Sequence, residues 1–368
     1  GETEKKLAVP NELGIQGKSF ILMDAGTGKI LFHGNEHEKM HPASITKIMT
    51  IMLTLEAIEK GKIKPTNKVT ASELAMNMGG TEIWLEPGEQ MSIEELLIAA
   101  SVGSANDACV ALAEHIAGSE TSFVKMMNKK AQEIGMKDTF FRNSNGLPEE
   151  GHHTSAYDIA LLCQYSFKKY PQILKYTSIR EYHLREGKTW LVNTNHMLGV
   201  YKGMDGIKTG WTEDAGFCLA ATAQRDNFRL IAVELGAENP KQRSEDITAL
   251  LNYGFANYTA VPIIKKGEEV IQLKVKRGIT DKVKLLAKED LVAVAPADEE
   301  GNLKKEVFIA KKLVAPLQKG QVVGELRVKA NDHLAGKVDL VVAEDVKKGG
   351  ILRSIFQFIL SLFMFWQR

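Results

Sequence analysis

The chain is poor in cysteine and has almost no net charge. Its three cysteines, Cys109, Cys163 and Cys218, lie far apart, match no metal-binding spacing and would leave one thiol over if two of them paired. We expect them to be buried as small hydrophobic residues. The 47 Lys and Arg residues against 46 Asp and Glu residues give a formal net charge of +1, so the sequence has no overall basic field that would attract nucleic acid.

Long apolar runs are absent as well. No stretch reaches the roughly 20 apolar residues that a membrane-spanning helix needs. The first residues, Gly1 to Lys6, lack the apolar run of a signal peptide and are typical of a mature N-terminus. With 368 residues, 44% of them hydrophobic, the chain is long enough for two domains, each with its own core.

Up to about residue 261 the pattern predicts an α+β domain. Two short apolar runs, 19–23 and 29–32, flank a Gly-containing turn and predict a hairpin, and a helix is expected from Ser44 to about Lys60, with apolar residues on one side. Further helices are expected at 93–100, 107–117, 122–134, 155–169 and 245–257, and strands at 217–223 and 228–235. Since strands at both ends enclose the helices, we expect the first hairpin to join the late strands in one sheet.

Beyond Val261-Pro262 the pattern changes to short apolar runs between charged or glycine-containing turns. This pattern predicts a small all-β sandwich over 262–345, with a positioning or interaction role. Residues 346–368 then predict an amphipathic helix that lies at a membrane surface, with two lysines before it and a broad apolar side. Its narrow polar side would hold Arg353, Ser354, Gln357 and Ser361, and Trp366 and Arg368 would close it.

Three short motifs carry the chemistry: Ser44-Ile45-Thr46-Lys47, Ser104-Ala105-Asn106 and Lys208-Thr209-Gly210. On a helix Lys47 would share a face with Ser44, so its amine can reach the hydroxyl and take its proton. Burial and a nearby cation such as Lys208 would lower the pKa of Lys47 and make it a base. Each motif alone is weak evidence, but the three in this order predict acyl transfer through a serine ester.

The chain resembles the low-molecular-weight penicillin-binding proteins of the D-alanyl-D-alanine carboxypeptidase type, the serine peptidases of the penicillin-binding protein 5 type. The likeness rests on the three motifs, on 141–147 and 151–158 between the second and third motifs, and on Ala215-Gly216-Phe217 after the third. It covers roughly residues 15–260 well and the remainder more loosely. The resemblance implies a catalytic domain of the β-lactamase and transpeptidase fold over residues 1–261, followed by the β domain and the helix.

The resemblance also implies a role for each site residue. Ser44 would be the nucleophile, Lys47 its general base and Ser104 a relay that passes a proton to the departing amine. Asn106 would hold the substrate amide, and the strand edge that contains Lys208, Thr209, Gly210 and Trp211 would bind the peptide and its carboxylate. The backbone N–H groups of Ser44 and Trp211 would form the oxyanion hole, while the Trp211 side chain has no assigned role beyond packing.

The implied reaction removes the terminal D-Ala from peptidoglycan stem pentapeptides. Penicillin and other β-lactams would acylate the same serine, and the enzyme would work at the outer face of the cytoplasmic membrane. Two alternatives remain: a β-lactamase, or a β-lactam sensor without turnover. No cofactor is expected, and although His152 and His153 lie beside Glu149 and Glu150, no third ligand at a suitable spacing supports a metal.

Overall fold

The computed structural model describes residues 11–365, and residues 351–354 and 363–365 only by their backbone. Gly1 to Lys6, expected to be a mature N-terminus, lie outside the described residues, as do Trp366 and Arg368 at the far end. The chain forms two compact units, Gly1–Ala256 and Asn257–Arg368. The change of pattern expected near Val261-Pro262 falls within the first strand of the second unit, β10 (Tyr258–Ile264).

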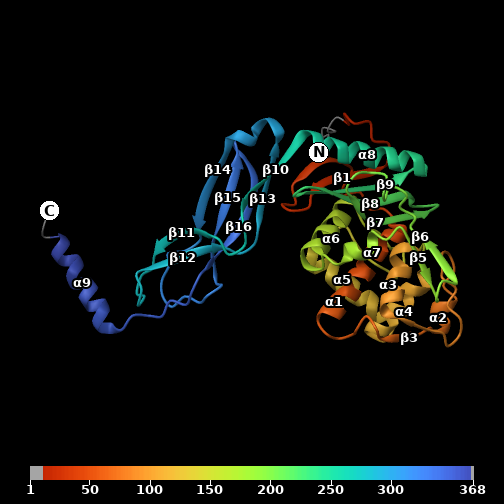
Figure 1. Ribbon diagram of the computed structural model, residues 1–368, viewed down its shortest axis with the longest axis horizontal. Coiled ribbons are helices and arrows are strands. Elements are labelled where there is room, and N and C mark those ends of the chain that lie inside the picture. Colours follow the sequence, from red (N-terminus) through yellow and green to blue (C-terminus); the bar gives the residue numbers. More distant parts are fainter. Residues whose placement is uncertain (1–10, 366–368) are drawn as a thin grey trace, which may run out of the picture. The chain divides into compact units, whose positions relative to one another are not determined.

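A five-stranded antiparallel sheet is the centre of the first unit (Figure 1). Its order is β2-β1-β9-β8-β7, and β1 pairs with β9 so that Ile21 lies opposite Val233. The expected joining of the N-terminal hairpin to the late strands is therefore confirmed. The strands are β1 (Ser19–Asp24), β2 (Ile30–Gly34), β7 (Met204–Thr212), β8 (Gly216–Arg225) and β9 (Phe228–Ala237).

Helices lie on both faces of this sheet: α8 along one face and the remaining long helices on the other (Figure 1). The first of these, α1, follows a 3-10 turn, η1, that contains Ser44. The helices are η1 (Ala43–Thr46), α1 (Lys47–Glu59), α2 (Glu73–Met76), α3 (Ile93–Val102), α4 (Asn106–Ala117), α5 (Glu120–Ile134), α6 (Ala156–Lys169), α7 (Ile173–Thr177) and α8 (Pro240–Asn257).

Helix α1 differs from the one-sided helix that its sequence predicts, because every residue from Lys47 to Ala57 is buried. The polar residues on its other side have internal partners: Thr50 donates a hydrogen bond to the Ser144 carbonyl, and Thr54 donates one to the Thr50 carbonyl. Because α1 is enclosed on all sides, its first residues and the turn η1 before it, which contains Ser44, are held rigidly.

Two short hairpins complete the first unit. They are formed by β3 (Lys68–Thr70) with β4 (Gln90–Ser92), and by β5 (Glu181–Leu184) with β6 (Thr189–Val192). An ion pair between Arg185 and Glu89, 2.6 Å long, links the β5–β6 hairpin to the segment before β4. Cys109, Cys163 and Cys218 are all buried and free, as expected.

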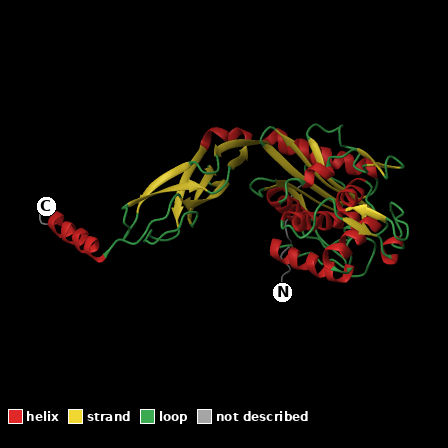
Figure 2. Ribbon diagram, turned by 60° about the horizontal axis from the view of Figure 1, so that its bottom comes forward, coloured by secondary structure: helices red, strands yellow, loops and turns green. Residues whose placement is uncertain are grey.

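The second unit is all-β apart from a short 3-10 turn and its last helix (Figure 2). One sheet has the order β11-β12-β16-β15-β14, and β10 pairs with β13 in another. The edge strand β14 has the sequence LKKEVFI, in which the charged residues obscure the strand pattern. The remaining elements are β11 (Glu269–Lys274), β12 (Lys282–Ala287), β13 (Leu291–Pro296), η2 (Ala297–Asn302), β14 (Leu303–Ile309), β15 (Val322–Ala330), β16 (His333–Val342) and α9 (Ile351–Phe365).

Candidate active site

The turn η1 places Ser44 one helical turn from Lys47. The Lys47 Nζ atom lies 2.8 Å from the Ser44 Oγ atom, so the structure brings together the two residues that the first motif predicts. Ser44 itself is half-buried, whereas the Lys47 side chain is fully buried. The hydroxyl is therefore reachable from outside while the amine that faces it is shielded from solvent.

Lys47 is held by three acceptors and has a strongly altered acidity. Besides Ser44 Oγ, its Nζ donates to the Asn106 Oδ1 atom at 2.7 Å and to the Asn145 carbonyl at 2.8 Å. Burial lowers the pKa of Lys47 to about 8, although the Cys109 thiol and the Asp107 carboxylate act in the opposite direction. An amine with this pKa is partly neutral near pH 7 and can accept a proton.

The second motif lies in the loop between α3 and α4. Ser104 is buried and has a left-handed backbone with φ of +52°, which is uncommon for a residue other than glycine. Asn106 begins α4, and besides its bond to Lys47 its Nδ2 atom donates to the Gly79 carbonyl at 3.0 Å. Its backbone N–H donates to the Thr81 carbonyl at 2.8 Å. The second motif is thus tied both to Lys47 and to the segment that precedes β4.

Asp107 does more than begin a helix. Its buried carboxylate accepts the backbone N–H groups of Ile83 at 3.1 Å and of Leu85 at 3.0 Å. These bonds fix the same segment whose carbonyls bind Asn106. Nothing in the local sequence indicates this role, because the partners are more than 20 positions away.

The third motif lies on β7, the edge strand of the sheet. A Cβ atom at Gly210 would come within 2.9 Å of the Ser44 backbone nitrogen and 3.1 Å of that of Ile45, so glycine lets the strand lie directly against the nucleophile turn. Since Trp211 follows Gly210 in the strand, its backbone N–H and that of Ser44 belong to neighbouring segments.

Lys208 is buried and donates a hydrogen bond to the Thr209 carbonyl at 3.0 Å. Burial lowers its pKa well below the ordinary value for lysine, and the positive charge of Lys47 lowers it further. Of the two causes that the sequence suggested for the lowered pKa of Lys47, burial is found, while the repulsion between the two amines lowers the pKa of Lys208 instead. The site therefore holds two amines that do not favour carrying a charge at the same time.

Thr209 is buried, whereas Trp211, the residue after the third motif, lies at the surface. The Thr209 hydroxyl makes a short hydrogen bond with the hydroxyl of Thr194, a residue that the sequence analysis did not select. Thr194 is exposed and comes two residues after β6. The Trp211 ring is 57% exposed and packs against Phe217 with 5.8 Å between the ring centroids, which agrees with a packing role at the rim.

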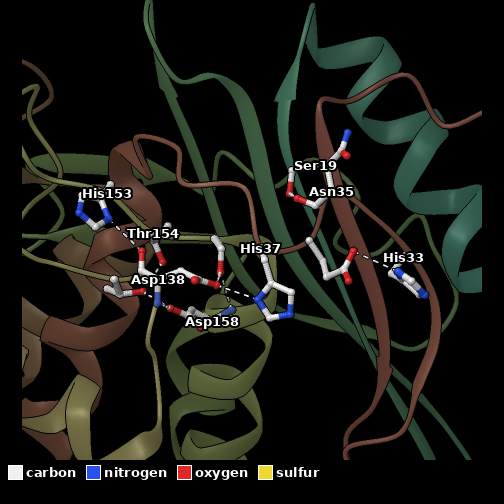
Figure 3. Close-up of polar contacts among 11 residues, drawn as sticks. Ser19, His33, Asn35, His37, Asp138, His153, Thr154 and Asp158 are labelled. Atoms are coloured by element: carbon white, nitrogen blue, oxygen red, sulfur yellow. Dashed lines mark hydrogen bonds and ion pairs between the residues drawn. The ribbon is translucent and has the colours of Figure 1, made fainter. Parts of the chain in front are cut away.

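The segment that leads from β2 to Ser44 is anchored to residues 138–158 (Figure 3). His37 Nδ1 lies 2.8 Å from the Asp138 carboxylate, and His153 Nδ1 lies 2.8 Å from the Asp138 carbonyl. Met40 and Thr154 exchange two backbone hydrogen bonds of 2.8 Å. His153 therefore helps to hold this part of the chain in place. The neighbouring His152 contacts Thr46, in the turn that contains Ser44.

Comparisons with known proteins agree with this geometry. The family model described as D-alanyl-D-alanine carboxypeptidase matches residues 5–239, and the model described as the C-terminal domain of penicillin-binding protein 5 matches residues 258–348. The D-alanyl-D-alanine carboxypeptidase DacF of Bacillus subtilis is 44% identical over 93% of this chain and 89% of its own length. DacC of Escherichia coli is 34% identical over 96% of this chain and 90% of its own length.

Solved structures show the same similarity. Penicillin-binding protein 5 of Haemophilus influenzae has a TM-score of 0.82 and 34% identity, with 92% of this chain and 99% of that chain covered. Penicillin-binding protein D2 of Listeria monocytogenes, solved with bound ampicillin, has a TM-score of 0.62 and 30% identity, and covers 67% of this chain and 100% of its own. The expected fold class is thereby confirmed for both units.

Proposed function

Since the chain belongs to the D-alanyl-D-alanine carboxypeptidase family, it is a serine-type peptidase that acts on D-Ala-D-Ala termini, and we propose that its acyl-enzyme forms on Ser44. It removes the terminal D-Ala of peptidoglycan stem pentapeptides and is acylated by penicillin, and the β-lactamase and sensor alternatives are not favoured. The observation that carries the proposal is the 2.8 Å contact between Ser44 Oγ and a fully buried lysine amine.

Neutral Lys47 is the base of the first step. It accepts the Ser44 hydroxyl proton while Oγ attacks the carbonyl carbon of the bond between the two D-Ala residues. With a pKa of about 8, about one tenth of Lys47 is neutral at pH 7. The backbone N–H groups of Ser44 and Trp211 stabilise the oxyanion.

Departure of D-Ala requires a proton on its nitrogen. We assign its delivery to Ser104, whose proton is replaced from the Lys47 ammonium as the carbon–nitrogen bond breaks. The Asn106 amide would bind the substrate backbone, and Lys208 and Thr209 would bind its terminal carboxylate. Water then attacks the ester, Lys47 again accepts the proton, and Ser44 regains its hydroxyl.

Release of D-Ala from a peptide that ends in D-Ala-D-Ala tests these roles. We expect turnover without added metal and in the presence of a chelator, and no turnover by the Ser44→Ala variant. Ser178→Ala removes an exposed hydroxyl that binds only a nearby carbonyl, so it is a matched control and should keep full activity. D-Ala release by Ser44→Ala, or loss of release on chelation, would contradict the proposal.

We further propose that α9 holds the enzyme at the outer face of the cytoplasmic membrane. The side chains described in α9 are all exposed, and only Gln357 and Ser361 among them are polar. The side chains of Arg353 and Ser354, expected on the same polar side, are not described. In the described part of the chain no helix is long and apolar enough to cross a membrane, and a helix of this length with a large exposed apolar surface favours the interface.

Liposome flotation tests the anchor. The full chain should float with vesicles that contain anionic lipid, while a chain that ends at Glu344 should not float and should release D-Ala at the same rate. Equal flotation of the two proteins would refute the role of α9.

A further inference from the structure

The residue before the nucleophile has an unusual backbone conformation. Ala43 is completely buried and has φ of +49°, the left-handed region that residues other than glycine rarely adopt. Its carbonyl lies so close to Gly146 that a Cβ atom there would come within 1.8 Å of it. Because such a conformation persists only when its surroundings hold it, the contacts of Ala43 decide where Ser44 points.

His41 supplies one of these contacts. Its Nδ1 atom accepts a hydrogen bond from the Ala43 backbone N–H at 3.1 Å. Since Nδ1 is the acceptor, the ring proton is on Nε2, and Nε2 is buried without a hydrogen-bond partner among the described residues. Burial lowers the pKa of His41, while the Leu147 backbone and the Asp214 carboxylate act in the opposite direction. The ring is therefore held neutral in one tautomer.

His152 supplies a second contact on the same turn. Its Nδ1 atom accepts the Arg142 backbone N–H at 2.8 Å, so its Nε2–H donates to the Thr46 Oγ1 atom, 2.7 Å away. Burial lowers the pKa of His152 to about 3, and its neighbours His41, His153 and Arg142 act in the same direction. The His152 and His41 rings lie 5.2 Å apart.

These contacts connect the nucleophile to the loop that holds its base. Arg142 precedes the segment 143–147, and that segment supplies both the Asn145 carbonyl bound to Lys47 and the Gly146 backbone against Ala43. His152 thus bridges the start of this segment to Thr46, and His41 fixes Ala43. Within the described part of the chain, the hydrogen bonds of the two histidines go to Ala43, Thr46 and Arg142 and not to Ser44 or Lys47, so any effect on the reaction passes through the backbone of the turn.

We propose that His41 and His152 are positioning residues, and that the turn presents Ser44 to Lys47 correctly only while His41 is neutral. Protonation of His41 removes the acceptor of the Ala43 N–H and places a cation beside His152. Acylation then requires two deprotonated groups, Lys47 and His41. The inference rests on the proposed acylation of Ser44 by Lys47 and adds a second proton to its pH dependence.

The test is the second-order rate of acylation by a fluorescent penicillin between pH 5 and pH 9. For the full chain, the logarithm of the rate should rise with a slope of about one per pH unit below pH 8, because of Lys47, and with a slope of about two at lower pH, where His41 is protonated as well. Circular dichroism at each pH verifies that the fold is intact.

Variants of His41 separate positioning from folding. Asparagine accepts an N–H two residues ahead in an Asx turn, so His41→Asn should acylate within about threefold of the parent at pH 8, with a slope that stays near one at low pH. His41→Ala should acylate about 10- to 100-fold more slowly at pH 8, since a buried N–H loses its acceptor. His33→Asn is the control, since the His33 ring is partly exposed and its one partner among the described residues is Glu36, and this variant should retain the slope of about two at low pH.

Each failure has its own meaning. If the full chain is not labelled at any pH, the acylation of Ser44 itself is wrong. Three other results would overturn the positioning role of His41. The logarithm of the acylation rate of the full chain could rise with a slope of one over the whole pH range, or the slope of two could persist in His41→Asn. Labelling of His41→Ala as fast as that of the parent would be the third.

Discussion

The first unit buries lysine, aspartate and glutamate side chains, whereas the buried side chains of the second unit, within its described residues, are all hydrophobic. Burying a charged group costs free energy unless it is paired or neutralised. Lys47 and Lys208 are both buried at the site, and both respond with a lowered pKa. The contrast separates a unit whose interior holds ionisable groups from one whose interior is apolar.

Among variants that test this contrast between the two interiors, Lys47→Met should have the largest effect on activity. Loss of the base should lower the rate of D-Ala release by about 10²–10⁴-fold. The free energy of unfolding should change by no more than about 2 kcal/mol, because Met removes a buried amine and its desolvation cost together with three hydrogen bonds. Steady-state kinetics and urea unfolding measure the two effects. A loss of activity that merely follows a loss of folded protein would contradict the account.

Leu340→Ala tests the other side of the comparison. Leu340 is fully buried in β16, in the core of the second unit. Its truncation should destabilise that unit by about 2–5 kcal/mol and leave the rate of penicillin acylation unchanged at temperatures where the unit is folded. Thermal unfolding with two probes, one for each unit, measures this. If the variant were acylated more slowly than the parent at temperatures below the unfolding transition, the two interiors would not be independent.

Not every buried charge of the first unit belongs to the site. Glu234 of β9 is completely buried, and neither of its carboxyl oxygens has a hydrogen-bond partner within the described residues. Burial raises its pKa to about 10, and the neighbouring Asp246 carboxylate, which accepts the Gln16 and Gly17 N–H groups, raises it too. Glu234 is therefore protonated at neutral pH.

The sign of the resulting pH dependence follows from this raised pKa. The proton on Glu234 stabilises the fold fully below the ordinary glutamate pKa of 4.5, and the stabilisation is lost as the pH rises toward 10, by up to about 1.4 kcal/mol per pH unit. Glu234→Gln should remove this slope and be more stable than the parent at pH 8. Urea unfolding between pH 5 and pH 9 measures it, and equal slopes in the two proteins would contradict the assignment.

Local spacing was enough to predict part of the site. The three-residue separation of Ser44 and Lys47 predicts their contact because a helical turn brings them together, and the position of Lys208 to Gly210 on a strand edge follows from the alternating pattern after it. The roles inferred for Asn106 and Trp211 depended on the resemblance, because nothing in their local sequence specifies a substrate contact.

Contacts between distant segments could not be predicted. The Asn145 carbonyl that binds Lys47 is a backbone group, and any residue type can supply one. His152 was considered as a metal ligand because its sequence neighbours are acidic, yet its ring nitrogens face Arg142 and Thr46. The Thr194 hydroxyl lies beside Thr209 only because the segment after β6 lies against β7. A single sequence carries no signal for such contacts.

The measurement that tests the central claim most directly is the intact mass of the protein after penicillin is added. The account predicts one covalent adduct on the full chain that persists for minutes or longer, and no adduct on the Ser44→Ala variant. An adduct of the same mass on Ser44→Ala would place the nucleophile elsewhere, and loss of the adduct from the full chain within seconds would contradict a carboxypeptidase that penicillin inhibits.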